Sequence, residues 1–306
     1  MIKLRTAAYC NLKLLLMFLV IYAHLIEPQI SVRREYFLLY RTIYLFHMPL
    51  FAFVSGLFIR DTAGCIRQLR RILPLYLIFQ TIAVLLGKAQ WHTPWWVLWY
   101  LLSLSCWLGL SALFLRRNRQ KWWILALSLG VGCLSGCFPW IGRPFGLSRT
   151  IVFFPWFWLG VILKPELPFH KLRPFTLPGL LLIFSDISPV TLYQAAPCPP
   201  LVRLRCYAAA LALGLLVLSW CPHRRFPWTR AGTDTLPAYL LHAPLIPFLR
   251  QLPCPALTTA AFLYLIFKAT QWHSAYGITG KEERPWPDSK TCTKPRASRF
   301  TGSYSP

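Results

Sequence analysis

This sequence is poor in charge, and above all in acidic residues. Only 14% of its 306 residues are charged and only nine are Asp or Glu, whereas a typical soluble domain is about 25% charged. By contrast, 56% of the residues are hydrophobic and 16% are aromatic. This balance excludes an ordinary soluble domain, and it excludes disorder for most of the chain. The length fits one membrane domain of about ten spans, at about 20 residues per span with short loops.

Several motifs of enzyme chemistry are also missing. The ten cysteines are scattered and include no Cys-x-x-Cys pair, which argues against a zinc or redox site and against a secreted disulfide scaffold. The chain has no Walker loop, no Gly-x-Ser-x-Gly elbow, no His-Glu-x-x-His and no dinucleotide fingerprint. We therefore expect no metal and no extramembrane catalytic domain, so that any chemistry takes place inside the membrane domain.

Apolar runs recur along the chain and predict an all-α fold, a polytopic membrane helix bundle of about ten transmembrane helices. Several of the runs contain a proline, such as Pro49, Pro74, Pro155 and Pro244. Proline is tolerated in a membrane helix when neighbouring helices satisfy the freed carbonyls, which indicates a packed bundle. The runs cover residues 7–26, 38–58, 72–87, 95–115, 122–141, 149–163, 175–190, 201–220, 235–249 and 255–271.

The basic residues predict the orientation. With a cytoplasmic N-terminus and ten alternating spans, 24 of the 33 Lys and Arg fall on the cytoplasmic side, as the positive-inside rule requires. Most of the net charge of +24 is thereby explained by topology, and binding to nucleic acid is not expected. No small-x-small cleavage site follows Leu14–Ile21, so the first helix is expected to remain uncleaved. We expect a membrane domain over 1–271 and a disordered cytoplasmic tail over 272–306.

The first helix carries ionisable side chains at membrane depth, where each is a functional candidate. Lys13 and His24 are eleven residues apart, which places them on one helical face, about 16 Å apart along the axis. Glu27 shares that face and could orient the imidazole. The structural alternative is a lysine that snorkels to the interface and a histidine that is hydrogen-bonded in the core.

The next two candidates lie near the second and third helices. His47 begins an apolar stretch that ends in Ser55-Gly56, a pair that favours close helix packing; a functional and a structural role for His47 are equally compatible with the sequence. Arg67 and Arg70, at i and i+3, suit a fork-like grip on phosphates. Their structural alternative is positive-inside anchoring.

Two further candidates, Arg149 and His242, lie later in the chain. Arg149 is a lone cation that enters an aromatic helix on the non-cytoplasmic side, where positive charge is disfavoured. It suits an oxygen-rich or anionic substrate, although a cation–π or carbonyl partner would also explain it. The aromatic residues at 91–100 indicate an interfacial belt, and a few of them could stack against a sugar.

These pieces resemble, in order, the motifs of the acyltransferase 3 membrane enzymes, and within them the fucose 4-O-acetylase-like group. The resemblance extends over roughly residues 5–250. Two departures are visible: members often have Asp where Asn11 stands, and many outside this group have Arg where Lys13 stands. The matching segments are Asn11-Leu12-Lys13 with Val20-Ile21-Tyr22-Ala23-His24, Phe46-His47-Met48-Pro49-Leu50-Phe51 with Ser55-Gly56, Arg67-x-x-Arg70 before Leu73-Pro74-Leu75-Tyr76, Trp99-Tyr100-Leu101, Ser148-Arg149-Thr150 with Phe153-Phe154-Pro155, and Tyr239-Leu240-Leu241-His242.

The resemblance implies an O-acetyltransferase that moves an acetyl group from cytoplasmic acetyl-CoA to a hydroxyl of a surface carbohydrate or glycolipid. By position, His24 is the expected catalytic histidine, acting as general base or transient acyl carrier, with Glu27 beside it. Lys13, Arg67 and Arg70 are expected to bind the coenzyme. His47, Arg149 and His242 are the expected substrate-binding residues.

The resemblance also implies a multi-pass protein of a bacterial inner membrane, in contact with membrane lipid. The alternative function is a transporter or flippase of a sugar-linked lipid that uses the same cavity without acyl chemistry; it would be marked by broken helices at matching positions of two repeated halves, and no such repeat is evident. The sequence allows a homo-oligomer and does not identify the acceptor sugar.

Overall fold

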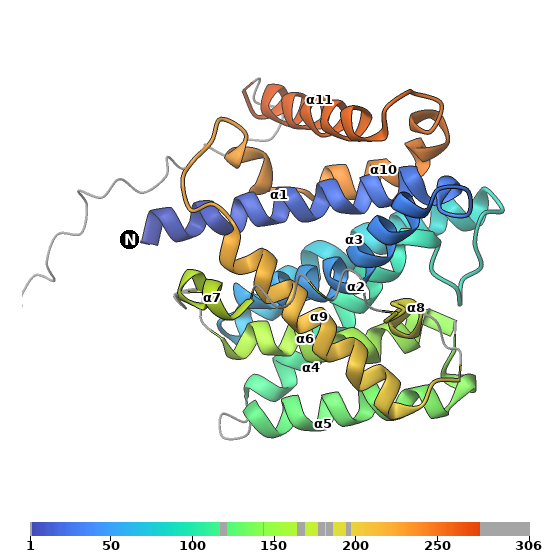
Figure 1. The fold of residues 1–306 in the computed structure, drawn as a ribbon, viewed down its shortest axis with the longest axis vertical. Coiled ribbons are helices and arrows are strands. Elements are labelled where there is room, and N and C mark those ends of the chain that lie inside the picture. Colours follow the sequence, from blue (N-terminus) through green and yellow to red (C-terminus); the bar gives the residue numbers. More distant parts are fainter. Residues whose placement is uncertain are drawn as a thin grey trace, which may run out of the picture. The chain divides into compact units, whose positions relative to one another are not determined.

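The computed structural model describes residues 2–116, 121–142, 144–163, 169–176, 181, 186–193 and 197–275 (Figure 1). The chain divides into two compact units, residues 1–263 and 264–306. All contacts discussed below lie within the first unit. The tail expected at 272–306 lies outside the described residues, apart from 272–275, which end the last helix.

The described residues form α-helices and short 3-10 segments, with no β-strand. Six of the helices are long and apolar enough to cross a membrane, and Lys121–Cys137 and Leu236–Leu249 are shorter apolar helices. The predicted all-α membrane helix bundle is therefore confirmed. The α-helices are α1 (Ile2–Ile26), α2 (Arg34–Leu57), α3 (Thr62–Leu85), α4 (Trp99–Leu115), α5 (Lys121–Leu134), α6 (Leu147–Ile162), α7 (Arg173–Thr176), α8 (Val190–Tyr193), α9 (Pro200–Trp220), α10 (Leu236–Leu249) and α11 (Pro255–Ala275).

Helix α3 begins ten residues before the expected span at 72–87. Asp61 is its N-cap, and the carboxylate accepts a hydrogen bond from the Gly64 backbone N–H at 2.7 Å. This cap satisfies one of the free amides of the first turn. An arginine-rich stretch does not read as an apolar span, so the hydropathy pattern misses the first turns. As a result, Arg67 and Arg70 lie on the helix itself.

The expected span at 175–190 lies mostly outside the described residues. The short helices on either side of it contact opposite ends of α9. Arg173 donates from Nε to the Ser219 carbonyl at 3.0 Å, near the end of α9. The Thr191 carbonyl accepts from Arg203 near its beginning, at 3.1 Å. Helices α7 and α8 therefore lie at opposite ends of α9.

Two glycines allow α2 and α6 to approach closely. A Cβ on Gly56 would collide with the backbone carbonyl of Phe157, and a Cβ on Gly160 would collide with the carbonyl of Phe53. Small residues at such crossings let helix backbones pack in membranes, where there is no hydrophobic force between helices. The packing role predicted for Gly56 is confirmed, and Ser55 adds a 2.9 Å hydrogen bond to the Tyr100 hydroxyl.

The prolines expected inside spans lie inside helices, as predicted. Pro49 is within α2, Pro74 within α3 and Pro155 within α6. Helix α10 contains Pro244 and also Pro247. Each proline lacks an N–H and leaves the carbonyl four residues earlier without its helical partner.

One arginine of the expected non-cytoplasmic side is completely buried. Arg203, on α9, is 0% exposed and joins three segments. Its Nε donates to the Thr191 carbonyl, and its Nη1 donates to the Gly132 carbonyl at 3.0 Å and to the Ser135 hydroxyl at 2.6 Å. A buried guanidinium requires such acceptors. Arg203 thus fastens α9 to α8 and to the end of α5.

The helices of the first unit place functional candidates at two separate ends of α1. The first, which we call the Lys13 end, contains the beginnings of α1, α3 and α10. The second, which we call the His24 end, contains the end of α1 and the beginnings of α2, α4 and α6. Helices α1 and α10 are in contact along their length (Figure 1). At each of the two ends, a residue of α1 therefore contacts a residue more than 200 positions later in the chain.

Candidate active site

A polar cavity of about 230 Å³ lies at the His24 end. Four of the predicted site residues line it: His24 and Glu27 from the end of α1, His47 from α2 and Arg149 from α6. Aromatic side chains supply most of the remaining wall. A concave site with aromatic walls and a few convergent polar groups is the usual form of a small-molecule site. The aromatic lining residues are Tyr40, Tyr44, Trp96, Trp99, Tyr193 and Tyr239.

His24 and Glu27 are adjacent on the last turn of α1. The His24 Nδ1 lies 3.9 Å from the Glu27 Oε2, and the histidine side chain is only 12% exposed. The Tyr44 hydroxyl is 3.5 Å from the same Nδ1, and the Tyr40 hydroxyl donates to the Glu27 Oε1 at 3.4 Å. A carboxylate and a phenol on the Nδ1 side leave Nε2 as the ring nitrogen for chemistry.

Arg250, just after α10, holds the end of α1 in place. Its guanidinium donates to the His24 carbonyl oxygen from Nη2 at 2.7 Å and from Nε at 3.1 Å, and Nη2 also lies 3.0 Å from the Glu27 Oε2. The last carbonyls of a helix have no intrahelical partner and accept such donors. Arg250 therefore satisfies the helix end and also fixes the carboxylate next to the imidazole.

His47 and His242 each donate from Nδ1 to a backbone carbonyl. The Nδ1 of His47 lies 2.6 Å from the Ile43 carbonyl, and that of His242 lies 2.6 Å from the Tyr239 carbonyl. Because a carbonyl only accepts, each Nδ1 carries a proton, and in the neutral ring Nε2 is then the acceptor. The His242 Nε2 is buried without a partner among the described residues. The His242 ring also stacks on that of His24, with centroids 5.7 Å apart.

Arg149 belongs to an aromatic group at the cavity wall. Its guanidinium carbon lies 5.1 Å from the Trp99 ring centroid, and its Nε donates to the Tyr193 carbonyl at 2.9 Å. Burial raises the pKa of Tyr193 well above its usual value, and the nearby Arg149 charge opposes this shift. The phenol therefore stays protonated at neutral pH and donates to the Tyr44 carbonyl at 2.8 Å. Arg149 thus has the cation–π and carbonyl partners of the structural alternative, and it also faces the cavity.

At the Lys13 end the predicted coenzyme-binding residues are less tightly organised. The Lys13 ammonium donates to the Thr233 carbonyl at 3.2 Å. Next to it, Arg71 on α3 pairs with Asp234, with 3.1 Å between Nη2 and Oδ2. Arg67 and Arg70 are exposed on the same helix. The structure therefore places all three predicted cations at this end and adds an ion pair that the sequence did not reveal.

Lys13 and His24 lie on the same face of α1, as their spacing predicts. Lys13 donates to the carbonyl of Thr233, which lies shortly before α10. His24 contacts His242 within α10 and Arg250 just after it. Both side chains therefore face the α10 side of the bundle. The two side chains are about 16 Å apart along the helix axis, and the cavity lining includes His24 but not Lys13.

Asn11 has a structural role at the Lys13 end. Its amide nitrogen donates to the carbonyls of Pro222 and Arg224 at 2.9 and 3.0 Å, and its oxygen accepts from the Thr229 hydroxyl at 2.7 Å. These bonds dock the segment between α9 and α10 onto α1. The segment approaches closely because Gly232 packs on the Cys10 backbone, where a Cβ would collide.

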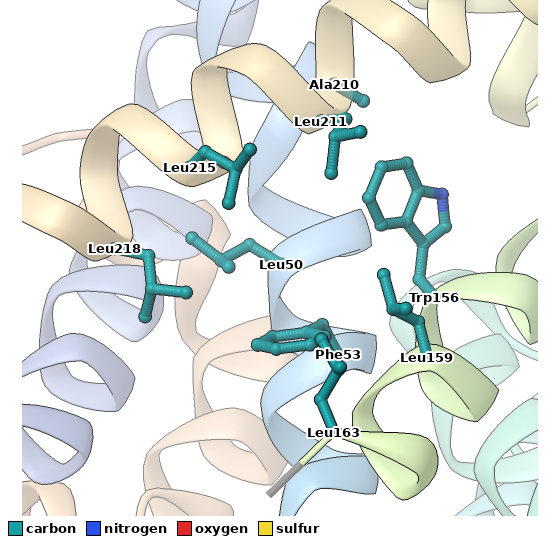
Figure 2. Close-up of a pocket in the computed structure, with 10 residues that line it drawn as sticks. Leu50, Phe53, Trp156, Leu159, Leu163, Ala210, Leu211, Leu215 and Leu218 are labelled. Atoms are coloured by element: carbon teal, nitrogen blue, oxygen red, sulfur yellow. The ribbon is translucent and has the colours of Figure 1, made fainter. Parts of the chain in front are cut away.

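A second cavity, of about 80 Å³, lies between α2, α6 and α9. Side chains such as Leu50, Phe53 and Leu215 point toward one another there (Figure 2). Its lining contains no ionisable side chain, so it offers no acid–base chemistry. Within the described part of the chain, no group of three or more His, Cys, Asp or Glu is arranged to hold a metal ion.

The sequence alone did not reveal three parts of this site. These are Arg250, Tyr44 and Tyr239, which contact the site only because segments distant in the sequence pack together. For Arg250 a signal was present: it is a lone cation after an apolar span on the expected non-cytoplasmic side, the same argument that singled out Arg149. Tyrosines in an aromatic-rich membrane protein carry no comparable signal.

The fold and the cavity define a polytopic membrane helix bundle with a histidine-containing polar site among its helices. The model of the acyltransferase 3 family, described as an acyltransferase domain, matches residues 9–270. The chain therefore belongs to the acyltransferase 3 family, and it is a multi-pass integral membrane acyltransferase. The match covers Lys13, His24 and all the residues that line the polar cavity. A search of curated proteins and a search of solved structures each found no match.

Proposed function

We propose that this acyltransferase moves an acetyl group from acetyl-CoA to a hydroxyl of a surface carbohydrate or glycolipid, with the N-terminus in the cytoplasm of a bacterial cell. The observation that carries the proposal is the arrangement along α1. His24 lines a polar cavity at one end, Lys13 lies among cations at the other, and both face α10. A donor with an anionic head and a long arm fits this separation of about 16 Å.

The Lys13 end suits the phosphates of the donor. Lys13, Arg67, Arg70 and Arg71 gather there, and Asp234 is the carboxylate paired with Arg71. Guanidinium groups bind phosphate oxygens bidentately, and this favours Arg67 and Arg70 as phosphate ligands. Lys13 offers a point charge at the beginning of the path to His24.

The His24 end suits hydroxyl chemistry. His24 Nε2 would accept the proton of the acceptor hydroxyl while the hydroxyl oxygen attacks the thioester carbonyl; the carbon–sulfur bond breaks, and the CoA thiolate leaves and takes up a proton. Alternatively, the imidazole would carry the acetyl group transiently before the hydroxyl receives it. Glu27, neutralised by Arg250, would hold the imidazole and stabilise its protonated form. The Nε2 of His47, which lines the cavity, suits a hydroxyl donor of the acceptor, whereas His242 is buried beside His24 and is not part of the lining.

The test is mass spectrometry of surface glycans from cells with and without the protein. Acetylation predicts glycans that are lighter by about 42 daltons per lost acetyl group when the protein is absent, a value that follows from group transfer itself. A second arm uses purified protein with acetyl-CoA labelled in the acetyl group. If cells without the protein make glycans of unchanged mass that fail to reach the surface, this would contradict acetyl transfer and indicate transport.

A further inference from the structure

The cavity wall contains a tryptophan in a backbone conformation that needs an explanation. Trp96 has φ of +33°, in the left-handed region that residues with a Cβ rarely adopt. Such a conformation costs of the order of 1–2 kcal/mol and persists only when the surrounding structure enforces it. Trp96 is the first residue of the 3-10 segment Trp96–Leu98, which leads into α4.

The structure enforces this conformation through a buried glutamine. Gln80 on α3 is 1% exposed, and its carboxamide makes three hydrogen bonds to the loop before Trp96. Nε2 donates to the carbonyls of Gln90 and Thr93 at 2.9 and 3.0 Å, and Oε1 accepts from the Trp95 backbone N–H at 2.8 Å. Both N–H donors of the side chain are thereby used, and its carbonyl oxygen accepts one bond. The loop is fixed up to the residue that precedes Trp96.

The residue after Trp96 is fixed as well. The carbonyl of Val97 accepts a hydrogen bond from the buried Tyr239 hydroxyl, and Leu98 donates from its backbone to the Trp95 carbonyl at 2.8 Å. Trp96 is therefore held from both sides while its own side chain keeps 36% of its surface exposed. This rigid arrangement presents an indole to the cavity and not to the core.

The position of the indole relative to His24 indicates what it is for. The Trp96 and His24 ring centroids are 4.7 Å apart, with an angle of 63° between the rings. A ligand that lies on the indole would have its edge beside the histidine. The face of an aromatic ring carries partial negative charge and attracts polarised C–H groups. The C–H face of a pyranose offers such groups, and its hydroxyls project from the ring edge.

We propose that Trp96 is the platform on which the acceptor sugar stacks, presenting a ring hydroxyl to His24. This inference rests on the proposed function and narrows the acceptor to a pyranose ring. An acyclic polyol has the same hydroxyl groups but no flat C–H face. It would bind the cavity only through hydrogen bonds and would gain nothing from the indole.

Binding without donor tests the platform separately from the chemistry. The full-length protein in lipid nanodiscs would be mixed with methyl glycosides of glucose, galactose and rhamnose, and separately with sorbitol, and saturation-transfer difference NMR would report the bound protons. We expect a signal on the ring C–H protons of at least one glycoside and a clearly weaker signal on sorbitol. Trp96→Ala should weaken glycoside binding about tenfold, the scale of about 1.4 kcal/mol.

Two variants serve as controls. Trp96→Phe keeps a ring at the same position and should retain binding within about threefold, since an aromatic face remains. Trp91, in the same loop, is 59% exposed and is not part of the cavity lining, so Trp91→Ala should bind like the wild type. Unchanged glycoside binding in Trp96→Ala, equal signals from sorbitol, or no glycoside signal from the wild type would each overturn the platform.

The outcome for the platform and the outcome for the proposed function can be told apart. If the wild type transfers acetyl groups and Trp96→Ala leaves the KM for a glycoside acceptor unchanged, the platform alone is wrong. If Trp96→Ala loses glycoside binding but the wild type transfers no acetyl group to any acceptor, the platform stands and acetyl transfer is wrong.

Discussion

Arg250 and His24, 226 positions apart in the sequence, are joined by two hydrogen bonds from one guanidinium to one backbone carbonyl, at 2.7 and 3.1 Å. The same guanidinium contacts the carboxylate of Glu27 at 3.0 Å. Arg250 does not line the cavity, so its effect on the chemistry would be exerted through the two residues that do. It is a positioning residue.

Replacing Arg250 by Ala should therefore slow turnover without changing substrate affinity. Hydrogen bonds to charged groups contribute about 1.5–3 kcal/mol each, and loss of one such contribution in the transition state corresponds to roughly a 10- to 150-fold lower kcat. Steady-state kinetics with labelled acetyl-CoA would measure kcat and the KM values of both substrates. Arg33→Ala is the matched control, because Arg33 is exposed at the same end. An unchanged kcat in Arg250→Ala would show that the guanidinium does not organise the site.

Asn11→Asp should destabilise the protein. The amide donates to two carbonyl oxygens, and a carboxylate would face both of them as a second acceptor. Leaving buried polar groups unpaired costs about 1–3 kcal/mol each. We expect the midpoint of thermal unfolding in detergent to fall by several degrees. Thr229→Val removes the hydroxyl that donates to Asn11 and accepts from the Phe226 backbone N–H, and it should also lower the midpoint; equal midpoints for Asn11→Asp and wild type would contradict this description.

Gly56→Ala should prevent α2 and α6 from packing. The added Cβ would overlap the Phe157 carbonyl, a backbone atom that cannot rotate away. Overpacking of this kind costs about 1–3 kcal/mol or more. Yield and monodispersity on size-exclusion chromatography would report the loss. Gly109→Ala, on α4, has open space around the new Cβ and should behave as the wild type. A monodisperse Gly56→Ala protein at normal yield would mean that the two helices are not in contact there.

If Arg67 and Arg70 bind the donor, replacing them should change the KM for acetyl-CoA but not the KM for the acceptor. Arg67→Ala and Arg70→Ala should each raise the KM for acetyl-CoA by about fivefold, because an exposed phosphate contact contributes about 1 kcal/mol. The KM for the acceptor should not change. Raising the salt concentration should shrink the difference from the wild type, since exposed charges are screened. Arg116→Ala removes another exposed arginine and serves as control. An acceptor KM that rises together with the donor KM would argue against a phosphate role.

The local parts of this structure could be predicted from the sequence. A helix of constant pitch decides that Lys13 and His24 share a face, and apolar runs of about 20 residues mark the spans even when they contain proline. The same reasoning identified Gly56 as a packing position. Each of these inferences depends only on residues within one helix.

The parts that could not be predicted depend on tertiary contacts. The beginning of α3 was missed because its first turns are polar, although Asp61 caps them. Arg250 meets His24, and Gln80 shapes the Trp96 loop, only after distant helices have packed. Such pairs leave no periodic signal in a single sequence. For this reason the sequence identified the histidine of the site but not Arg250, which positions it, and it did not single out Trp96 among the aromatic residues at 91–100.

Acetyl transfer by the His24→Ala protein is the most direct test of whether His24 performs the acyl chemistry. Purified His24→Ala protein in nanodiscs would be supplied with acetyl-CoA labelled in the acetyl group and with acceptor glycan. We expect transfer to fall by at least about 10²–10⁴-fold, the usual contribution of a general base, while the yield and thermal midpoint stay near those of the wild type. Substantial transfer by a well-folded His24→Ala protein would contradict the account.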